Sequence, residues 1–324
     1  MRILMLTMDK RYAVSFYRAA GIVRDLEKKL HATIDVYSWA DFLFDWTSLM
    51  RYDIVMLQRG FQGIHVVLCK KIKRLGIPLW LDFDDDLFNV PPENKAWATY
   101  NDPEVQKDIF TISSLADVIS VTTEDLKVAF SKYNDNIVVI PNAFNDFMFD
   151  IDRVLPERNK TVLWRGSDTH VYDLMYYNAP LDSCIKEHQD HQFIFMGFNP
   201  WFSTNSPNLK FIKTLDIQDY FDMGIKIAPS VVHVPLHDNI FNRSKSNIAF
   251  IEGSYWGAIC IIPEWWGKLP GTLTYNDVDS YHEAMEVAIT NNPNQNKQSW
   301  DYIKKNLLAS KVNNQRCKLI KSLI

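Results

Sequence analysis

Two cationic side chains and several polar groups follow an apolar segment in the second half of the chain. Residues 231–236 have the composition of a buried strand, and the polar run after them includes Arg243 and Lys245. We expect this run to open a helix that ends near Trp256, before a second buried strand at 259–262. Unpaired N–H groups at a helix start, together with two cations, suit a phosphate or diphosphate. The candidate anion contacts here are Asn242, Ser244, Lys245 and Ser246.

Glu252 lies further along the same expected helix. Its carboxylate could accept hydrogen bonds from a ribose diol, which would place a nucleoside beside the diphosphate. An ordinary capped surface helix with solvated basic residues explains the same pattern equally well. The strand, helix, strand order is that of a doubly wound parallel sheet, in which ligands bind beyond the carboxyl ends of the strands.

Four carboxylates crowd into the run Asp82-Phe83-Asp84-Asp85-Asp86, at the end of another apolar segment. Such charges repel one another unless a cation, an arginine or hydroxyl groups compensate. The run fits acceptor recognition or general-base catalysis, a divalent-metal site, or a helix cap in a solvated loop. A metal site is the weakest interpretation because no His or Cys lies at a fixed offset, and we predict none. We take Asp84, Asp85 and Lys245 as catalytic candidates, and Asp82 and Asp86 as acceptor contacts.

Two arginines of the first half lie close to expected strand ends. Arg18 is near the start of the helix after the first strand, and Arg59 closely follows the strand at 54–57. A helix-surface arginine is the commoner explanation for Arg18, but an anionic group could also bind there. We expect Arg18 and Arg59 to contact an acceptor.

A second anion-binding pattern follows the expected strand at 161–164. Glycine and hydroxyl residues directly after a strand let backbone N–H groups approach an anion, and an arginine adds charge. The segment contains neither GxGxxG nor GxxxxGK[ST], which disfavours dinucleotide dehydrogenases and P-loop proteins. The residues of this half-cradle are Arg165, Gly166, Ser167 and His170.

Short apolar strands alternate with amphipathic helices along the whole chain. We predict an α/β fold of two Rossmann-like domains that face each other across a cleft. The predicted boundaries are 1–144 for the first domain, 145–160 for a polar linker, and 161–296 for the second domain. The expected strands cover residues 3–7, 33–37, 54–57, 79–83, 118–121, 137–140, 161–164, 192–198, 209–213, 231–236, 259–262 and 272–275.

Composition fits a globular protein with full hydrophobic cores. The chain has 324 residues, of which 47% are hydrophobic, and no apolar run is long enough to cross a bilayer. Strand-like residues follow Met1 directly, so we expect no signal peptide. Four scattered cysteines without CxxC spacing indicate neither a zinc site nor a disulfide framework, and we expect a cytoplasmic protein.

The end of the chain is basic. Residues 297–324 hold seven Lys or Arg against Asp301, while the whole chain has a net charge of −4. We predict a basic C-terminal helix that packs back on the acidic body through Trp300, Ile303 and Leu307. Contact with nucleic acid or with an anionic membrane surface is the alternative.

Four segments carry a resemblance to a known family. They are ADVISVTTEDL at 116–126, VIPNA at 139–143, WRGS at 164–167, and FNRSKS at 241–246 leading to Glu252. In order and spacing the chain resembles nucleotide-sugar glycosyltransferases of the GT-B fold, in particular the retaining, glycogen-synthase-like family 4. The acidic run followed by LFNVP at 87–91 is similar to a subgroup of bacterial surface-polysaccharide and bacteriophage proteins.

The resemblance implies a retaining transfer from a nucleoside diphosphate sugar, with no obligatory cofactor. The C-terminal domain would hold this donor, with Glu252 on the ribose and residues 244–246 facing the diphosphate or sugar. The first of the family's paired glutamates falls at Ser244, and the family's Arg and Lys pair is displaced. We expect Arg165 and Lys245 to supply that charge.

Three functions remain open. The acceptor in the N-terminal domain could be a glycan or a lipid-linked saccharide, or a hydroxymethylated base in DNA, as for some bacteriophage enzymes. Lys70, Lys71, Lys73 and Arg74 could contact a DNA backbone, but the acidic body opposes tight nonspecific binding. A non-catalytic nucleotide- or sugar-binding protein is the third alternative.

Overall fold

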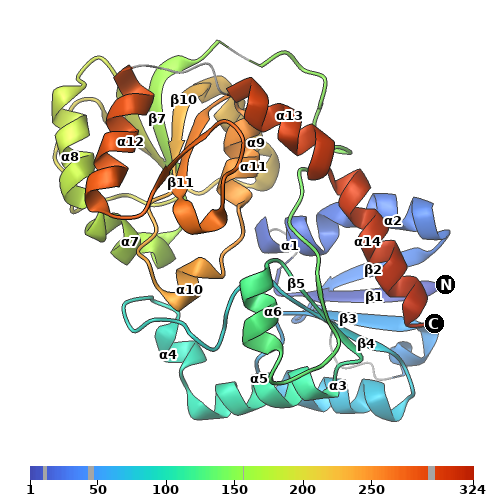
Figure 1. The fold of residues 1–324 in the computed structure, drawn as a ribbon. Coiled ribbons are helices and arrows are strands. Elements are labelled where there is room, and N and C mark those ends of the chain that lie inside the picture. The colour runs from blue at the N-terminus through green and yellow to red at the C-terminus, as the bar shows by residue number, and fades with distance from the viewer. Residues whose placement is uncertain (10–12, 43–46, 156, 291–295) are drawn as a thin grey trace.

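The computed structural model describes residues 1–9, 13–42, 47–155, 157–290 and 296–324. Residue 156, inside the predicted linker, and most of the stretch before the basic tail lie outside these ranges. Two parallel six-stranded sheets, one in each half of the chain, form two lobes (Figure 1). This confirms the α/β class with two Rossmann-like domains, while the domain boundaries stay a prediction.

The first sheet has the strand order β2-β1-β3-β4-β5-β6. Most of its strands are nearly continuous apolar runs, as expected where helices cover both faces of a sheet, whereas the edge strand β2 is more polar. Asp82 pairs in register with Gln58 on one side and Ser120 on the other, so polar groups meet at the carboxyl edge. The strands are β1 (Arg2–Thr7), β2 (Thr33–Ser38), β3 (Ile54–Gln58), β4 (Leu79–Phe83), β5 (Val118–Val121) and β6 (Ile137–Val139).

Helices from both ends of the chain cover this sheet. One face packs on α3 (Gly63–Arg74), α5 (Pro103–Leu115) and α6 (Glu124–Phe130). The other packs on α2 (Val23–Leu30) and α14 (Ala309–Ser322), the last helix of the chain (Figure 1). Two shorter helices, α1 (Ala13–Arg18) and α4 (Trp97–Tyr100), lie toward the second lobe.

The second sheet has the order β12-β11-β10-β7-β8-β9. Helices α7 (Val171–Tyr176), α8 (Asn178–Glu187) and α12 (Val278–Thr290) cover one face. Helices α9 (Ile217–Ile227), α11 (Ile248–Tyr255) and α13 (Asn296–Asn306) cover the other. The strands are β7 (Asn159–Arg165), β8 (Gln192–Met196), β9 (Leu209–Ile212), β10 (Pro229–His233), β11 (Ile259–Pro263) and β12 (Thr272–Tyr275).

The basic tail forms two helices instead of the single expected one. Backbone bonds explain the break, because Phe144 N–H donates to the carbonyl of Leu307 at 2.7 Å and Ala309 N–H donates to the carbonyl of Phe144 at 2.7 Å. Helix α13 packs on α11 of the second lobe, whereas α14 packs on α2 of the first. The tail therefore ties the two lobes together. No helix among the described residues has the length and apolar character needed to cross a membrane.

Candidate functional site

Arg59 holds two carboxylates of the acidic run beyond the end of β4. Its Nε and Nη2 donate to the two oxygens of Asp84, and Nη2 also donates to Asp85 Oδ2 at 2.9 Å. Arg59 has a left-handed backbone with φ 50°, which turns the chain sharply after β3. The compensating charge for these carboxylates is thus an arginine.

Asp85 also contacts the second lobe. Its Oδ1 lies 3.4 Å from Nζ of Lys245, which in turn lies 4.3 Å from the centroid of the Phe241 ring. Burial acts to raise the pKa of Asp85, but Lys245 and Arg59 outweigh it and lower the pKa below its ordinary value. For Asp84, burial prevails over Arg59 and raises the pKa. Asp85 is therefore the ionised partner of Lys245.

Arg18 and Asp82 form a closed ion pair inside the first lobe. Both side chains are 1% exposed, and Arg18 donates to the two oxygens of Asp82 at 2.9 and 2.6 Å. A further donor of Arg18 reaches the carbonyl of Ile140 at 2.6 Å. The expected acceptor contacts of Arg18 and Asp82 must be corrected, because neither side chain reaches the space between the lobes.

Asp86 also lies in the interior. It accepts from the backbone N–H groups of Phe88 and Asn89 at 3.0 and 3.3 Å, and from Asn89 Nδ2 at 2.7 Å. Burial raises the pKa of this fully buried carboxyl, and these three donors partly oppose it. Asp86 therefore organises the loop after the acidic run, and the expected acceptor contact is corrected to a structural role.

The expected helix from the polar run to Trp256 is divided in two. A single turn, α10 (Ile240–Arg243), is followed by Ser244, Lys245 and Ser246, and α11 begins only at Ile248. We call residues 244–246 the crossing turn because the first lobe contacts it. Thr123 Oγ1 donates to the carbonyl of Ser244 at 2.9 Å, and Asn142 Nδ2 donates to Ser246 Oγ at 2.8 Å. These contacts hold the turn outside a helix.

Glu252 is enclosed within the molecule. The hydroxyls of Tyr17 and Tyr220 each donate to its carboxylate at 2.6 Å, and Tyr17 comes from the first lobe. Nε of Arg165 lies 2.6 Å from Glu252 Oε2, but its N–H is not directed at that oxygen, so the contact is an ion pair. With 2% exposure and these partners, Glu252 does not face the cavity, and the expected ribose contact is corrected.

Asn242 and His170 meet at a second carboxylate. Asp173 Oδ1 accepts from Asn242 Nδ2 at 2.7 Å, while Asp173 Oδ2 lies 2.9 Å from His170 Nδ1. Asn242 is buried and therefore positions the loop before the crossing turn, whereas His170 lines the cavity described below.

Gly166 lies against Trp164, because a Cβ at Gly166 would come within 2.7 Å of that indole ring.

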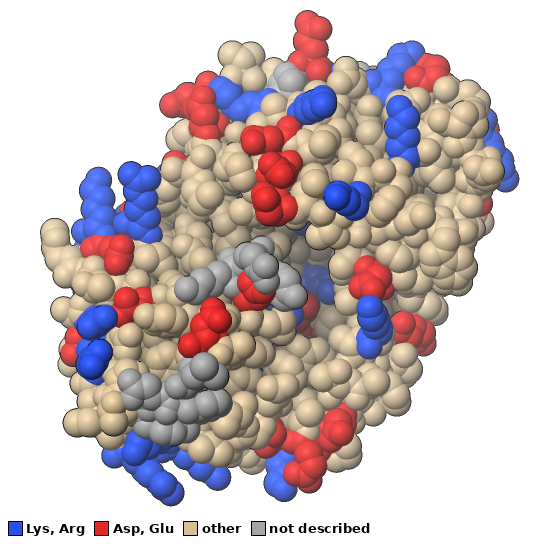
Figure 2. Space-filling view, turned by 180° about the vertical axis from the view of Figure 1, so that it is seen from behind, with Lys and Arg blue, Asp and Glu red and all other residues tan. Residues whose placement is uncertain are grey.

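Two neighbouring cavities lie where the lobes meet. A cavity of about 180 Å³ lies between β7, β10 and the start of α11, and one of about 660 Å³ borders the first lobe. The two share Val14 and Arg59, and Figure 2 shows a hollow between the lobes. Predicted residues at the smaller cavity are Arg59, Asp84, Asp85, Arg165, His170, Lys245 and Ser246, and Ser167 lines the larger one.

Sequence reasoning missed the residues that join the lobes. Tyr17, Asn142 and Lys95 of the first lobe contact the second lobe, with Lys95 Nζ 2.5 Å from Asp168 Oδ2, whereas Tyr220 supports Glu252 from within the second lobe. Aromatic residues at helical spacing look like ordinary core in a sequence. Among these residues, only Asn142 could have been singled out from the sequence, because it lies in the VIPNA segment that carries the family resemblance.

No protein-family model and no curated protein sequence matches the chain. Anabaena HepE in complex with UDP-glucose is similar in structure, with a TM-score of 0.70 at 11% identity, covering 99% of this chain and 100% of that one. The lipopolysaccharide outer core galactosyltransferase WaaB has a TM-score of 0.60 at 11% identity, covering 99% and 100%. The fold is GT-B. A UDP-GlcNAc 2-epimerase from Neisseria meningitidis bound to UDP-GlcNAc shares it, with a TM-score of 0.51 at 12% identity, covering 94% and 99%.

Proposed function

We propose that this GT-B protein is a glycosyltransferase that moves a sugar from a nucleoside diphosphate sugar to an acceptor hydroxyl, with retention. The observation that carries the proposal is the convergence of Arg165, Lys245 and the start of α11 on one cavity between the lobes. Ligands of open α/β sheets bind at such carboxyl edges. Structural neighbours with UDP-glucose or UDP-GlcNAc bound support the donor class.

The diphosphate fits best between the crossing turn and Arg165. Nη2 of Arg165 is buried and has no hydrogen-bond partner among the described residues, so it can donate to an anion without giving up another hydrogen bond. Ile248 and Ala249, at the start of α11, line the same cavity, and the N–H groups of a first helical turn lack intrahelical partners. Apolar and aromatic side chains, including Trp266 and Leu236, line the remaining wall and suit a base.

Lys245 and Asp85 are the residues that we assign to the chemistry. Departure of a nucleoside diphosphate develops negative charge, and a nearby ammonium stabilises it. Once the diphosphate binds Lys245, Oδ1 of Asp85 is free to accept a hydrogen bond from a hydroxyl of the sugar or acceptor, while Oδ2 stays paired with Arg59. Asp84 remains in its bidentate pair with Arg59, so we assign it a positioning role. Retention rests on the family resemblance.

We propose a lipid-linked or membrane-associated saccharide as the acceptor. The outer face of α3 exposes Ile64 and Val67, and Lys70, Lys71 and Arg74 lie on the same helix. An apolar strip beside cations is typical of peripheral contact with an anionic bilayer. Salt-dependent cosedimentation with vesicles that contain phosphatidylglycerol tests this, with Val67→Ser/Lys71→Ser as the variant. Unchanged cosedimentation of that variant contradicts the surface assignment.

Thermal unfolding across a panel of nucleotides and nucleotide sugars tests the donor class. A ligand that binds only the folded protein raises the melting temperature, and the best ligand is then assayed for sugar transfer. We expect stabilisation by one nucleoside diphosphate and its sugars. Absence of any stabilisation contradicts the proposal.

An epimerase acting on a nucleotide sugar is the second candidate, because the Neisseria epimerase shares the fold. Proton NMR of UDP-GlcNAc incubated with the protein separates the two functions. Conversion at C2 without an acceptor supports the epimerase, whereas transfer or slow donor hydrolysis supports the transferase.

Transfer to hydroxymethylated DNA would support the bacteriophage-type function, and binding without turnover would support a non-catalytic protein. On the face in Figure 2, acidic and basic side chains are intermingled, with no continuous basic field for DNA.

A further inference from the structure

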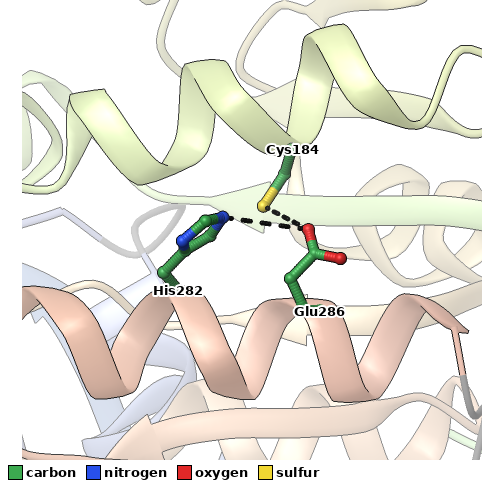
Figure 3. A group of neighbouring side chains, drawn as sticks. All are labelled: Cys184, His282 and Glu286. Carbon is green, nitrogen blue, oxygen red and sulfur yellow. Dashed lines mark hydrogen bonds and ion pairs between the residues drawn. The ribbon is translucent and has the colours of Figure 1, made fainter.

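Two helices on the outer face of the second lobe bring together three unlike metal-ligating side chains. Helix α8 supplies Cys184, and α12 supplies His282 and Glu286, which are four residues apart and share one helix face (Figure 3). One ligand atom from each residue lies within 4.8 Å of both others. Local spacing does not indicate this group, because 98 residues separate Cys184 from His282 and there is no CxxC spacing.

The distances are close to those around a tetrahedral ion. Sγ of Cys184 lies 3.4 Å from Glu286 Oε1, and Nε2 of His282 lies 3.8 Å from the same oxygen. Ligand atoms around tetrahedral zinc are about 3.3 to 3.8 Å apart, given its bond lengths of about 2.0 to 2.3 Å. The sulfur–oxygen separation already fits, and the nitrogen–oxygen separation is longer than the roughly 3.3 Å of two such zinc ligands, so side-chain movement of His282 toward Glu286 would complete the site.

The polar atoms of this group are incompletely satisfied. Nε2 of His282 is buried and has no hydrogen-bond partner among the described residues, although it points at Glu286 (Figure 3). Cys184 is fully buried, while His282 and Glu286 are partly exposed, so an ion can enter from solvent. A cation bound here would take the place of the thiol proton and satisfy the unpartnered nitrogen.

His188 supplies the support that metal-binding carboxylates usually have. Its Nε2 lies 2.9 and 3.0 Å from the two oxygens of Glu286. Such a contact orients a ligating carboxylate and is commonly worth about 10- to 100-fold in metal affinity. His188 therefore acts as a positioning residue.

We propose that Cys184, His282 and Glu286 bind one zinc ion, which cross-links α8 to α12, with water as the fourth ligand. Sulfur, nitrogen and oxygen donors together match this borderline ion better than calcium or magnesium, which prefer oxygen alone. None of the three residues lines the cavities between the lobes, so the ion is structural. The inference does not depend on the proposed transferase activity.

A neighbouring group is the competing explanation for any metal binding. His188, Asp190 and His191 also lie within 4.8 Å of one another through their ligand atoms. Asp190 is already paired with Lys160 at 2.5 Å, and the group has no thiol. Variants of Cys184 and Asp190 therefore tell the two groups apart.

Titration of chelator-treated full-length protein tests the proposal. We expect one equivalent of Zn²⁺ by calorimetry, and Co²⁺ in its place should give visible bands of tetrahedral geometry with a thiolate charge-transfer band. Glu286→Gln and Cys184→Ser should each lower Zn²⁺ affinity by about 100-fold or more, beyond the loss typical of a supporting residue. Cys184→Ser should also abolish the charge-transfer band.

Two variants serve as controls. His31→Asn removes an exposed histidine elsewhere, and Asp190→Asn disables the neighbouring group, so both should bind Zn²⁺ like the wild type. Circular dichroism of each metal-free variant checks the fold, and the surface-facing Glu286→Gln keeps the test valid if Cys184→Ser is unstable. Zn²⁺ binding that survives Glu286→Gln, that is lost in Asp190→Asn, or that is absent from the wild type overturns the proposal.

Discussion

The carboxylate of Asp85 and the ammonium of Lys245 lie 3.4 Å apart across the boundary between the two lobes. Arg59 fixes Asp85 from the first lobe, and the crossing turn presents Lys245 from the second. In the proposed reaction, this pair would lie where the donor in one lobe meets the acceptor in the other. Arg59 and Lys245 together offset part of the negative charge of the acidic run.

Replacing Lys245 by Met should reduce sugar transfer by about 100-fold or more, because one preorganised cation is lost from the departing diphosphate. Arg243→Met is the matched control, since Arg243 lies two residues away but is exposed and paired with Asp238. Initial rates at saturating donor measure the effect. Equal losses in the two variants would contradict the role of Lys245.

Breaking the Arg18–Asp82 pair should destabilise the protein rather than impair acceptor binding. Arg18→Met leaves a buried carboxylate without its cation, which costs about 3 to 5 kcal/mol in the free energy of unfolding. The double variant Arg18→Met/Asp82→Leu should recover part of this loss, because no buried carboxylate is then left without its arginine, although the buried Arg316 loses the favourable charge of Asp82. Urea unfolding measures stability; a stable Arg18→Met protein with a raised KM for the acceptor would restore the acceptor assignment.

Tyr17→Phe should loosen the contact between the lobes. The change removes a hydrogen bond to a buried carboxylate, for which about 1.5 to 3 kcal/mol is typical. Tyr133→Phe, remote from this boundary, provides the comparison. Hydrogen exchange should rise in α1 and α11 of the Tyr17 variant; exchange unchanged in both helices would contradict the importance of this contact.

His65 should make the protein less stable in mild acid. Its Nδ1 accepts from the N–H groups of Phe61 and Gln62 at 3.2 Å, and burial lowers its pKa to about 4. The unfolded chain, with a pKa of about 6.5, then binds more protons, so stability is complete above pH 6.5 and falls as the pH drops toward 4. Relative to His65→Gln, the wild type should lose up to about 3 kcal/mol over this range by urea unfolding. Parallel pH profiles of the two proteins would contradict this assignment.

The strands could be predicted from the sequence, whereas many side-chain partners could not. Buried parallel strands are continuous apolar runs, so segments such as Leu79–Phe83 and Val118–Val121 were located correctly. The break between α10 and α11 was missed because it depends on Thr123 and Asn142, which lie more than 100 residues away. Polar residues in local sequence look solvent-exposed until their distant partners are known.

The burial of Glu252 illustrates the same limit at the site. The sequence placed it further along the same expected helix as the anion-binding run, which suggested a ligand contact. Its partners Tyr17 and Tyr220 are 235 and 32 residues away, and they enclose the carboxylate. Lys245 and Asp85, by contrast, reach the cavity because each follows the end of a strand or helix that points toward it.

A crystal structure of the protein with UDP tests the central claim most directly. We predict that the diphosphate lies within hydrogen-bond distance of Lys245, Ser246 and the first N–H groups of α11, with Arg165 beside it. A nucleotide bound away from the cavity between the lobes, or a diphosphate that contacts neither Lys245 nor α11, would contradict the account.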